Sequence, residues 1–135
     1  ATKAADLRLA PLAWLRAGTA TVAVPPFCLK AIRETELGKD AIFASLNKAT
    51  AAKFGLAEGM RVRLTTEAGD ITARVHLSET VMNDTVAVPM GFGRTAFDEY
   101  SRGKGANAAA LFNAVPEPGT KLMAWSAPAV NIAKA

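Results

Sequence analysis

The chain has 135 residues, a mass of 14.1 kDa and a formal net charge of +4 at pH 7. This length is typical of one domain, and 50% apolar with 21% charged residues excludes a disordered tail. One cysteine, Cys28, and one histidine, His76, exclude an internal disulfide, a cysteine-based metal site and a zinc site built from several histidines. The basic residues form no run, which disfavours nucleic-acid binding, and no apolar stretch is long enough to span a membrane.

The first third of the chain alternates strand-like and turn-like segments. Residues Leu7–Leu12 and Thr19–Val24 are predicted strands, and the second must end at the prolines that follow it. Residues Ala31–Leu37 favour one or two helical turns, and Ala41–Leu46 is an apolar strand. The first sixteen residues contain arginines that interrupt any signal-peptide core. We therefore expect a processed chain or a piece of a longer one.

A helix and a two-stranded unit follow. Asn47 is a good N-cap for a helix over Lys48–Phe54, and Gly55 is a typical C-terminal stop. Residues Arg61–Thr66 and Ile71–Leu77 both alternate apolar and polar side chains around a turn at 68–70. The sequence therefore predicts an antiparallel hairpin with one buried face, and His76 falls on the other face.

The last part contains three more predicted elements and a tail. Residues Thr85–Pro89 form a strand, Asn107–Phe112 a short helix, and Lys121–Ser126 a last strand, after which residues 128–135 are loosely held. The whole pattern is mainly β with short helices. Because a sheet of this size must protect its edges, we expect a small closed or nearly closed barrel.

The segment 91–107 is the candidate for binding. Its four glycines permit close backbone approach or positive φ, and Arg94, Arg102 and Lys104 supply positive charge. Hydrogen-bonding side chains are also present, so the segment could hold a phosphate or the edge of a flat heterocycle. The same composition fits an ordinary solvated loop with glycines at its turns. Elsewhere we identify no catalytic constellation, because His76 and Ser78 lack the third group and the oxyanion hole of a triad.

The order of these segments resembles a known family. The segments that carry the resemblance are the capped helix with its glycine (47–56), the turn and strand 58–64, the turn and strand 67–73, and the glycine segments 91–94 and 103–107. Together they resemble the C-terminal molybdopterin-dinucleotide-binding domain of the dimethyl-sulfoxide-reductase superfamily of molybdenum and tungsten oxidoreductases. The spacing is most like the polysulfide- and thiosulfate-reductase branch, which includes subunits of membrane quinone-linked complexes.

The resemblance implies a fold and an organisation. The fold is a six-stranded double-psi β-barrel with short helices. Residues 1–40 would join the barrel as N-terminal strands and a loop, 41–127 would form its core, and 128–135 would be the loose tail. The whole would be a single domain, a fragment of a larger oxidoreductase.

The resemblance also implies a role. The chain would be a cofactor-binding cap domain that holds a molybdopterin guanine dinucleotide, carrying molybdenum or tungsten, jointly with other domains. It would have no catalysis of its own and no metal ligand. The implied partners are other domains of the same oxidoreductase and its iron–sulfur subunit, in a periplasmic or membrane-associated complex. The residues that match the family's cofactor segment are Gly91, Phe92, Gly93, Arg94, Tyr100, Gly105 and Asn107.

Two departures keep an alternative open. Arg94 stands where the family often has histidine, and Ala108 follows Asn107 where proline is common. Some quinone-linked relatives keep the fold without the cofactor, so the chain could be a cofactor-free structural domain of an electron-transfer complex. A stand-alone double-psi barrel is a further possibility. The aspartate decarboxylases on this fold cleave a Gly-Ser bond that is missing here, and the barrels that precede AAA ATPases would need a phosphate-binding loop, also missing.

Overall fold

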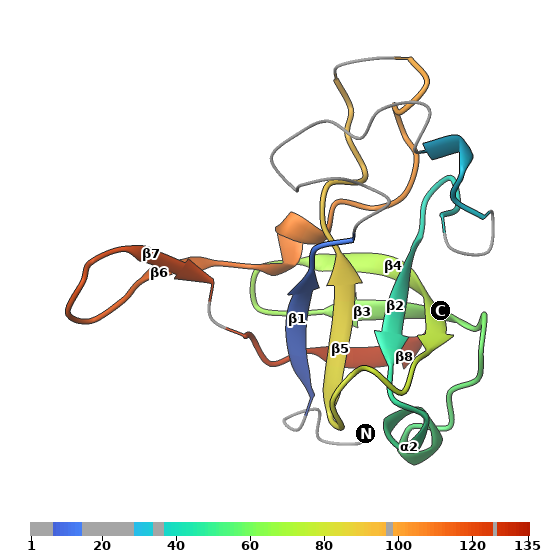
Figure 1. The fold of residues 1–135 in the computed structure, drawn as a ribbon, viewed down its shortest axis with the longest axis horizontal. Helices are drawn as coiled ribbons and strands as arrows, with labels where there is room; N and C mark the ends of the chain where they lie inside the picture. Colours follow the sequence, from blue (N-terminus) through green and yellow to red (C-terminus); the bar gives the residue numbers. More distant parts are fainter. Residues whose placement is uncertain (1–6, 15–28, 34–36, 97–98, 126) are drawn as a thin grey trace.

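The structure is a computed structural model that describes residues 7–14, 29–33, 37–96, 99–125 and 127–135 (Figure 1). The predicted strand Thr19–Val24 and Cys28 lie outside the described residues. The described elements, in chain order, are β1 (Arg8–Leu12), β2 (Ile42–Leu46), α2 (Lys48–Lys53), β3 (Arg61–Thr65), β4 (Asp70–Leu77), β5 (Thr85–Pro89), a single 3₁₀ turn η2 (Ala108–Leu111), β6 (Ala114–Pro116), β7 (Met123–Trp125) and β8 (Asn131–Lys134). The protein is therefore mainly β, as predicted.

Six strands form one mixed sheet in the order β1-β5-β2-β4-β3-β8. The pairs β1–β5 and β2–β4 are parallel, and the other neighbours are antiparallel. Strand β2 is buried along its whole length, as is typical of a strand covered on both faces. The core lies against these central strands, and Leu9, Leu46 and Val86 are among its fully buried side chains.

The hairpin predicted from alternation is present. Strands β3 and β4 pair antiparallel, with Leu64 opposite Ile71. Val62 and Leu64 are buried and Arg61 and Arg63 are exposed, because successive side chains of a strand point to opposite faces. The predicted helix is also confirmed at its start, since the Asn47 side chain accepts a hydrogen bond from the Ala49 N–H at 3.0 Å.

The prediction of a loosely held tail is wrong. Strand β8 pairs antiparallel with β3, and Ile132 lies opposite Leu64. Val130 is fully buried and its N–H donates to the Leu7 carbonyl at 3.0 Å. The tail forms a strand because Val130 and Ile132 alternate with exposed residues and β8 covers an edge of β3 that would otherwise stay open.

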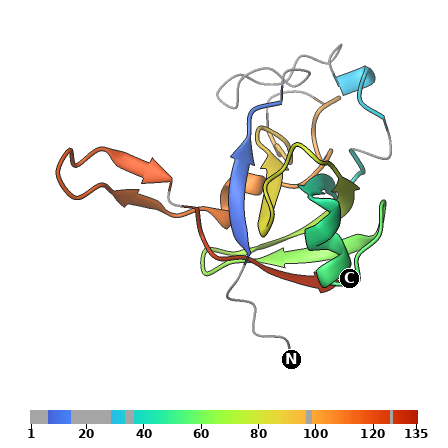
Figure 2. The same ribbon diagram turned by 60° about the horizontal axis from the view of Figure 1, so that its bottom comes forward.

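The prediction of a last strand at 121–126 is also only partly right. Residues Met123–Trp125 do form a strand, but they pair with β6 in a separate two-stranded sheet, with Val115 opposite Ala124. We call residues 114–125 the hairpin arm. It extends away from the six-stranded sheet in two views (Figures 1 and 2). No helix among the described residues is long and apolar enough to cross a membrane.

Candidate functional site

The candidate segment 91–107 leaves β5 and returns to η2 as a loop folded on itself. The Gly93 N–H donates to the Lys104 carbonyl at 2.9 Å, and the Gly103 N–H donates to the Arg94 carbonyl at 3.1 Å. The Gly105 N–H donates to the Gly38 carbonyl at 2.8 Å. Three glycine N–H groups that could have bound an anion are therefore engaged by the chain's own carbonyls.

Two of these glycines are required by packing. A Cβ on Gly93, whose φ is 71°, would collide with the backbone of Ala106 and Asn107. A Cβ on Gly105, whose φ is 73°, would come within 2.7 Å of Leu37 Cδ1 and 2.8 Å of Ile42 Cγ2. The close backbone approach expected of this segment is thus an approach to the protein itself.

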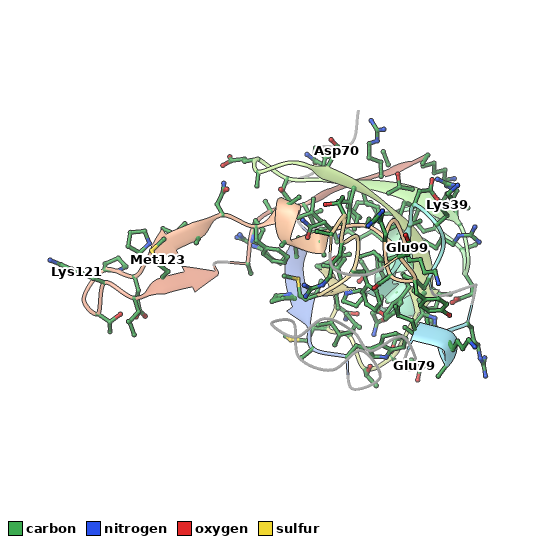
Figure 3. All side chains as sticks on the ribbon, turned by 90° about the horizontal axis from the view of Figure 1, so that it is seen from above. Lys39, Asp70, Glu79, Glu99, Lys121 and Met123 are labelled. Atoms are coloured by element: carbon green, nitrogen blue, oxygen red, sulfur yellow. The ribbon has the colours of Figure 1, made fainter. Side chains whose placement is uncertain are left out.

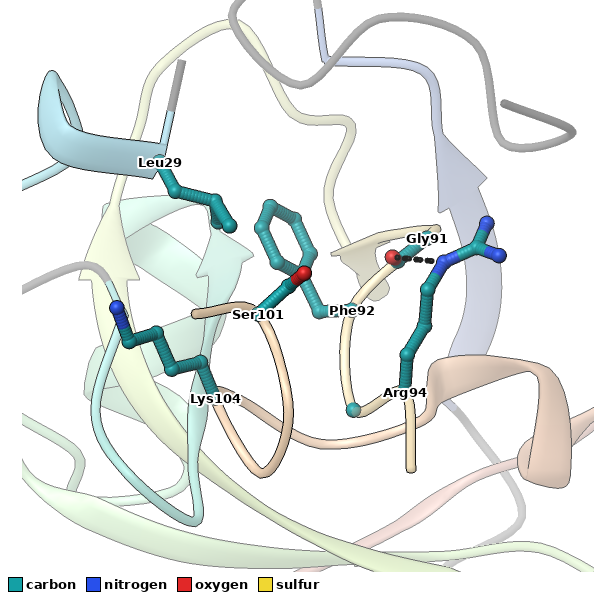
Figure 4. Close-up of a pocket in the computed structure, with 7 residues that line it drawn as sticks. Leu29, Gly91, Phe92, Arg94, Ser101 and Lys104 are labelled. Carbon is teal, nitrogen blue, oxygen red and sulfur yellow. Dashed lines mark hydrogen bonds between the residues drawn. The ribbon is translucent and has the colours of Figure 1, made fainter. Parts of the chain in front are cut away.

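The other predicted residues have partners within the chain. Phe92 is buried in the core, where its ring centroid lies 6.3 Å from that of Trp14. Arg94 Nε donates to the Gly91 carbonyl at 3.2 Å (Figure 4). Asn107 Oδ1 accepts from the Ala109 N–H at 3.1 Å, which makes Asn107 the N-cap of η2.

The cavity beside the candidate segment is very small. A cavity of about 10 Å³ is lined by Leu29, Gly91, Phe92, Gly93, Arg94, Ser101 and Lys104 (Figure 4). That volume holds about one water molecule. The structure therefore brings the first four predicted residues together around this cavity. Tyr100, Gly105 and Asn107 are not among its lining residues.

A larger, cationic groove lies beside this cavity. Its volume is about 750 Å³, and its lining includes Lys30, Lys39, Arg74, Arg102 and Lys104. Tyr100 also lines it, and the Lys104 ammonium lies 3.2 Å from the centroid of the Tyr100 ring. Five basic side chains from four segments of the chain therefore converge on this groove, which makes it attractive to an anion.

Arg74 is the notable member of this groove. Its Nε is buried and has no hydrogen-bond partner among the described residues. A buried guanidinium N–H without a partner is unfavourable, and Arg74 is one of the residues that line the groove. The alternation of residues Ile71–Leu77 in the sequence puts Arg74 on the polar face of a strand, with His76. It could not join Arg74 to Lys30 or Lys39, because no spacing rule links the three segments.

Asp40 lies close to this basic region. Arg61 Nη2 lies 2.7 Å from Asp40 Oδ2 in an exposed ion pair. The hydrogen bond and the charge of Arg61 lower the pKa of Asp40, and the charge of Arg74 lowers it further. Asp40 is therefore ionised at neutral pH and its charge is matched by Arg61.

A second groove, of about 380 Å³, lies over strands β1, β5, β2 and β4 and is partly aromatic. The rings of Trp14 and Phe43 meet edge to face at 5.1 Å, and the ring of His76 lies 5.9 Å from that of Phe43. His76 Nδ1 is 3.1 Å from Glu58 Oε1. No group of three or more metal-ligating side chains occurs in the part of the chain that the structure describes.

These features can be compared with what a pterin dinucleotide needs. The ligand carries phosphates, and the charges and volume of the cationic groove fit phosphate groups. Residues 91–94 line only a water-sized cavity, and the Gly93 N–H is already bonded to the Lys104 carbonyl. The basic side chains of the cationic groove are therefore better suited to hold phosphate groups than the glycines are.

Comparison with known proteins identifies the family of the chain. The family described as "Molydopterin dinucleotide binding domain" matches residues 29–125. The chain is 50% identical over 132 residues to the "Menaquinone reductase, molybdopterin-binding-like subunit" of Nitratidesulfovibrio vulgaris, covering 98% of this chain and 19% of that protein. The acetylene hydratase of Pelobacter acetylenicus has a similar structure, with a TM-score of 0.67 at 16% identity over 98% of this chain and 19% of that one. The chain thus spans about a fifth of each of these proteins, and it belongs to the molybdopterin dinucleotide binding domain family.

Proposed function

We propose that the chain is a structural domain of a quinone-linked electron-transfer complex, in which the fold of a cofactor-binding domain is kept without the cofactor. The observation that carries the proposal is the use made of segment 91–107. Gly93 and Gly105 pack against the protein's own backbone and side chains, the cavity beside the segment holds only about 10 Å³, and Asn107 caps η2. A segment engaged in this way braces the sheet.

The curated relative supports the same direction. Its name describes a menaquinone reductase subunit that is molybdopterin-binding-like, and 98% of this chain aligns with it. By analogy, the chain would sit in a membrane-associated complex with other domains of its own polypeptide and an iron–sulfur subunit. Within that assembly it would have no catalysis of its own.

The test is the metal and pterin content of the full-length protein that carries this sequence. We expect neither molybdenum nor tungsten in stoichiometric amount, and no fluorescence of oxidised pterin after acid extraction. Stoichiometric metal and pterin would contradict the proposal. A molybdopterin-containing member of the same family, prepared in parallel, shows that extraction works.

The second candidate is a cap domain that holds molybdopterin guanine dinucleotide, and the cationic groove favours it. Arg74, with its unpartnered Nε, and Lys104 would bind the phosphates. The predicted cofactor residues Gly91, Phe92, Gly93, Arg94, Tyr100, Gly105 and Asn107 would then lie beside the bound group. If the full-length protein does contain pterin, Arg74→Gln should lower that content, and Arg63→Gln on a strand outside the groove should leave it unchanged.

We further propose that the six-stranded sheet closes as a double-psi barrel. The two end strands of the sheet order are β1 and β8, and the segment before β8 meets β1 directly. The Leu9 N–H donates to the Pro128 carbonyl at 2.9 Å, and Arg8 forms an isolated bridge with Ala129. These contacts support closure between the first and last strands.

The proposed organisation follows from the same contacts. Residues 41–127 would supply the barrel core, 1–40 would join it through β1, and 128–135 would complete it. Strands from all three parts pair in one sheet, which supports a single domain. Limited proteolysis would test this organisation. We expect the whole chain to resist the protease and no stable shorter core to appear.

A further inference from the structure

The hairpin arm is the part of the molecule least explained by the fold. Its two strands form a sheet of their own, and every described side chain from Asn113 to Ala124 is exposed. Its described hydrogen bonds run within the arm, such as that from the Glu117 N–H to the Leu122 carbonyl at 2.9 Å. Since an isolated two-stranded hairpin is only marginally stable in water, the arm needs a surface to cover it.

The side chains of the arm indicate what kind of surface that is. Val115, Leu122 and Met123 are 47%, 70% and 61% exposed, which is unusual for large apolar residues gathered on one element. The only charged residues of the arm are Glu117 and Lys121, one of each sign, and both lie at the turn. Figure 3 shows Lys121 and Met123 on the arm, far from the other labelled side chains. The arm is therefore neutral, with apolar strands and a charged tip.

We propose that the hairpin arm docks its strands into a neutral, apolar groove on the larger body of the polypeptide to which this domain belongs. The chain spans 19% of each compared protein, so a domain of this kind has a much larger body beside it. The family match runs through β7, so the arm belongs to the family domain. A lipid bilayer is the less suitable surface, because the charged tip would have to enter the hydrocarbon first.

The docking proposal rests on the proposed function only in taking this domain as part of a larger protein. Cross-linking tests the docking. In the full-length protein, a benzophenone amino acid replaces Met123 in one variant and Glu67, in the exposed turn between β3 and β4, in the control. After illumination, mass spectrometry identifies what was captured. We expect the Met123 probe to capture peptides of the same polypeptide outside residues 1–135, and the Glu67 probe to capture none.

A second variant makes the result depend on the apolar surface. With the probe at Val115, the change Leu122→Asp/Met123→Asp should abolish the cross-link, because charged side chains do not enter a neutral apolar groove. Both residues are exposed, so this change leaves the fold of the domain intact.

Four outcomes would overturn the proposal: capture of lipid, of a second copy, or of another subunit, and a Met123 yield no higher than that at Glu67. Metal and pterin content is measured on the same preparations. The proposed cofactor-free role can thus fail while the docking of the arm holds, and the docking can fail while the cofactor-free role holds.

Discussion

Segments 91–107 and 114–125 are near neighbours in the chain, and they relate to the six-stranded sheet in opposite ways. The first has four glycines and folds back so tightly that Gly93 and Gly105 have no room for a side chain. The second carries Val115, Leu122 and Met123 and leaves the sheet with these side chains exposed. A glycine-rich loop is usually taken as the place for a ligand, and an apolar hairpin as part of a core. Here the loop packs against the core, and the hairpin leaves its large apolar side chains exposed.

The largest expected effect is that of Phe92→Ala in the 135-residue chain. Phe92 is a predicted cofactor residue, and it is also buried among the core side chains. Removing a buried phenyl ring costs about 3–5 kcal/mol of unfolding free energy, which urea denaturation would measure. Phe92→Leu should cost less because it leaves a smaller cavity. A loss near zero for Phe92→Ala would show that the loop is not part of the core.

Gly93→Ala should be next, at about 2–4 kcal/mol, because it combines positive φ with a collision against backbone. Gly103→Ala is the matched control. Gly103 has a φ of 70° but nothing within 4 Å of its Cβ position. Gly103→Ala should therefore lower the unfolding free energy only by the conformational strain of about 1–2 kcal/mol. Equal losses in the two variants would remove the packing contribution assigned to Gly93.

Asn107→Ala should lower the unfolding free energy by about 1 kcal/mol, because η2 loses its N-cap. Asn107→Ser should keep most of that stability, since serine also accepts a hydrogen bond at this position. Thermal unfolding of the three proteins would compare them. A serine variant as unstable as the alanine variant would mean that the amide group has another role.

The smallest effect is expected in the arm. Met123→Ser in the 135-residue chain should change the unfolding free energy by no more than about 0.5 kcal/mol, as for other exposed positions. The same urea measurement applies. A loss above about 1 kcal/mol would indicate that the arm packs on its own sheet, and the contrast with Phe92 would disappear.

Local rules predicted much of the fold. Alternation placed β3 and β4 and their buried faces, and the Asn47 cap placed the start of α2. Two elements escaped these rules. Strand β6 is three residues long, fully exposed and ends in a proline, so it has no alternation to detect. Strand β8 was not predicted because it forms by pairing with β3, which lies far away in the sequence.

The candidate site was less predictable than the fold. The glycines of segment 91–107 were visible in the sequence, but what approaches them was not, because Leu37 and Ile42 reach Gly105 only after folding. The cationic groove joins Lys30, Arg74 and Lys104 from separate segments. Convergence of this kind is a property of the tertiary structure and leaves no spacing in the chain.

The contact between β1 and the segment before β8 has a consequence for biosynthesis. The Arg8 side chain reaches the Ala127 carbonyl across 119 positions, and Leu7 and Leu9 bond to the same stretch. A nascent chain therefore holds β1 and β3 without these partners until residues 128–135 have left the ribosome. Unpaired strand edges recruit strands from other chains. During translation, β1 and β3 would therefore keep open edges until residues 128–135 pair with them.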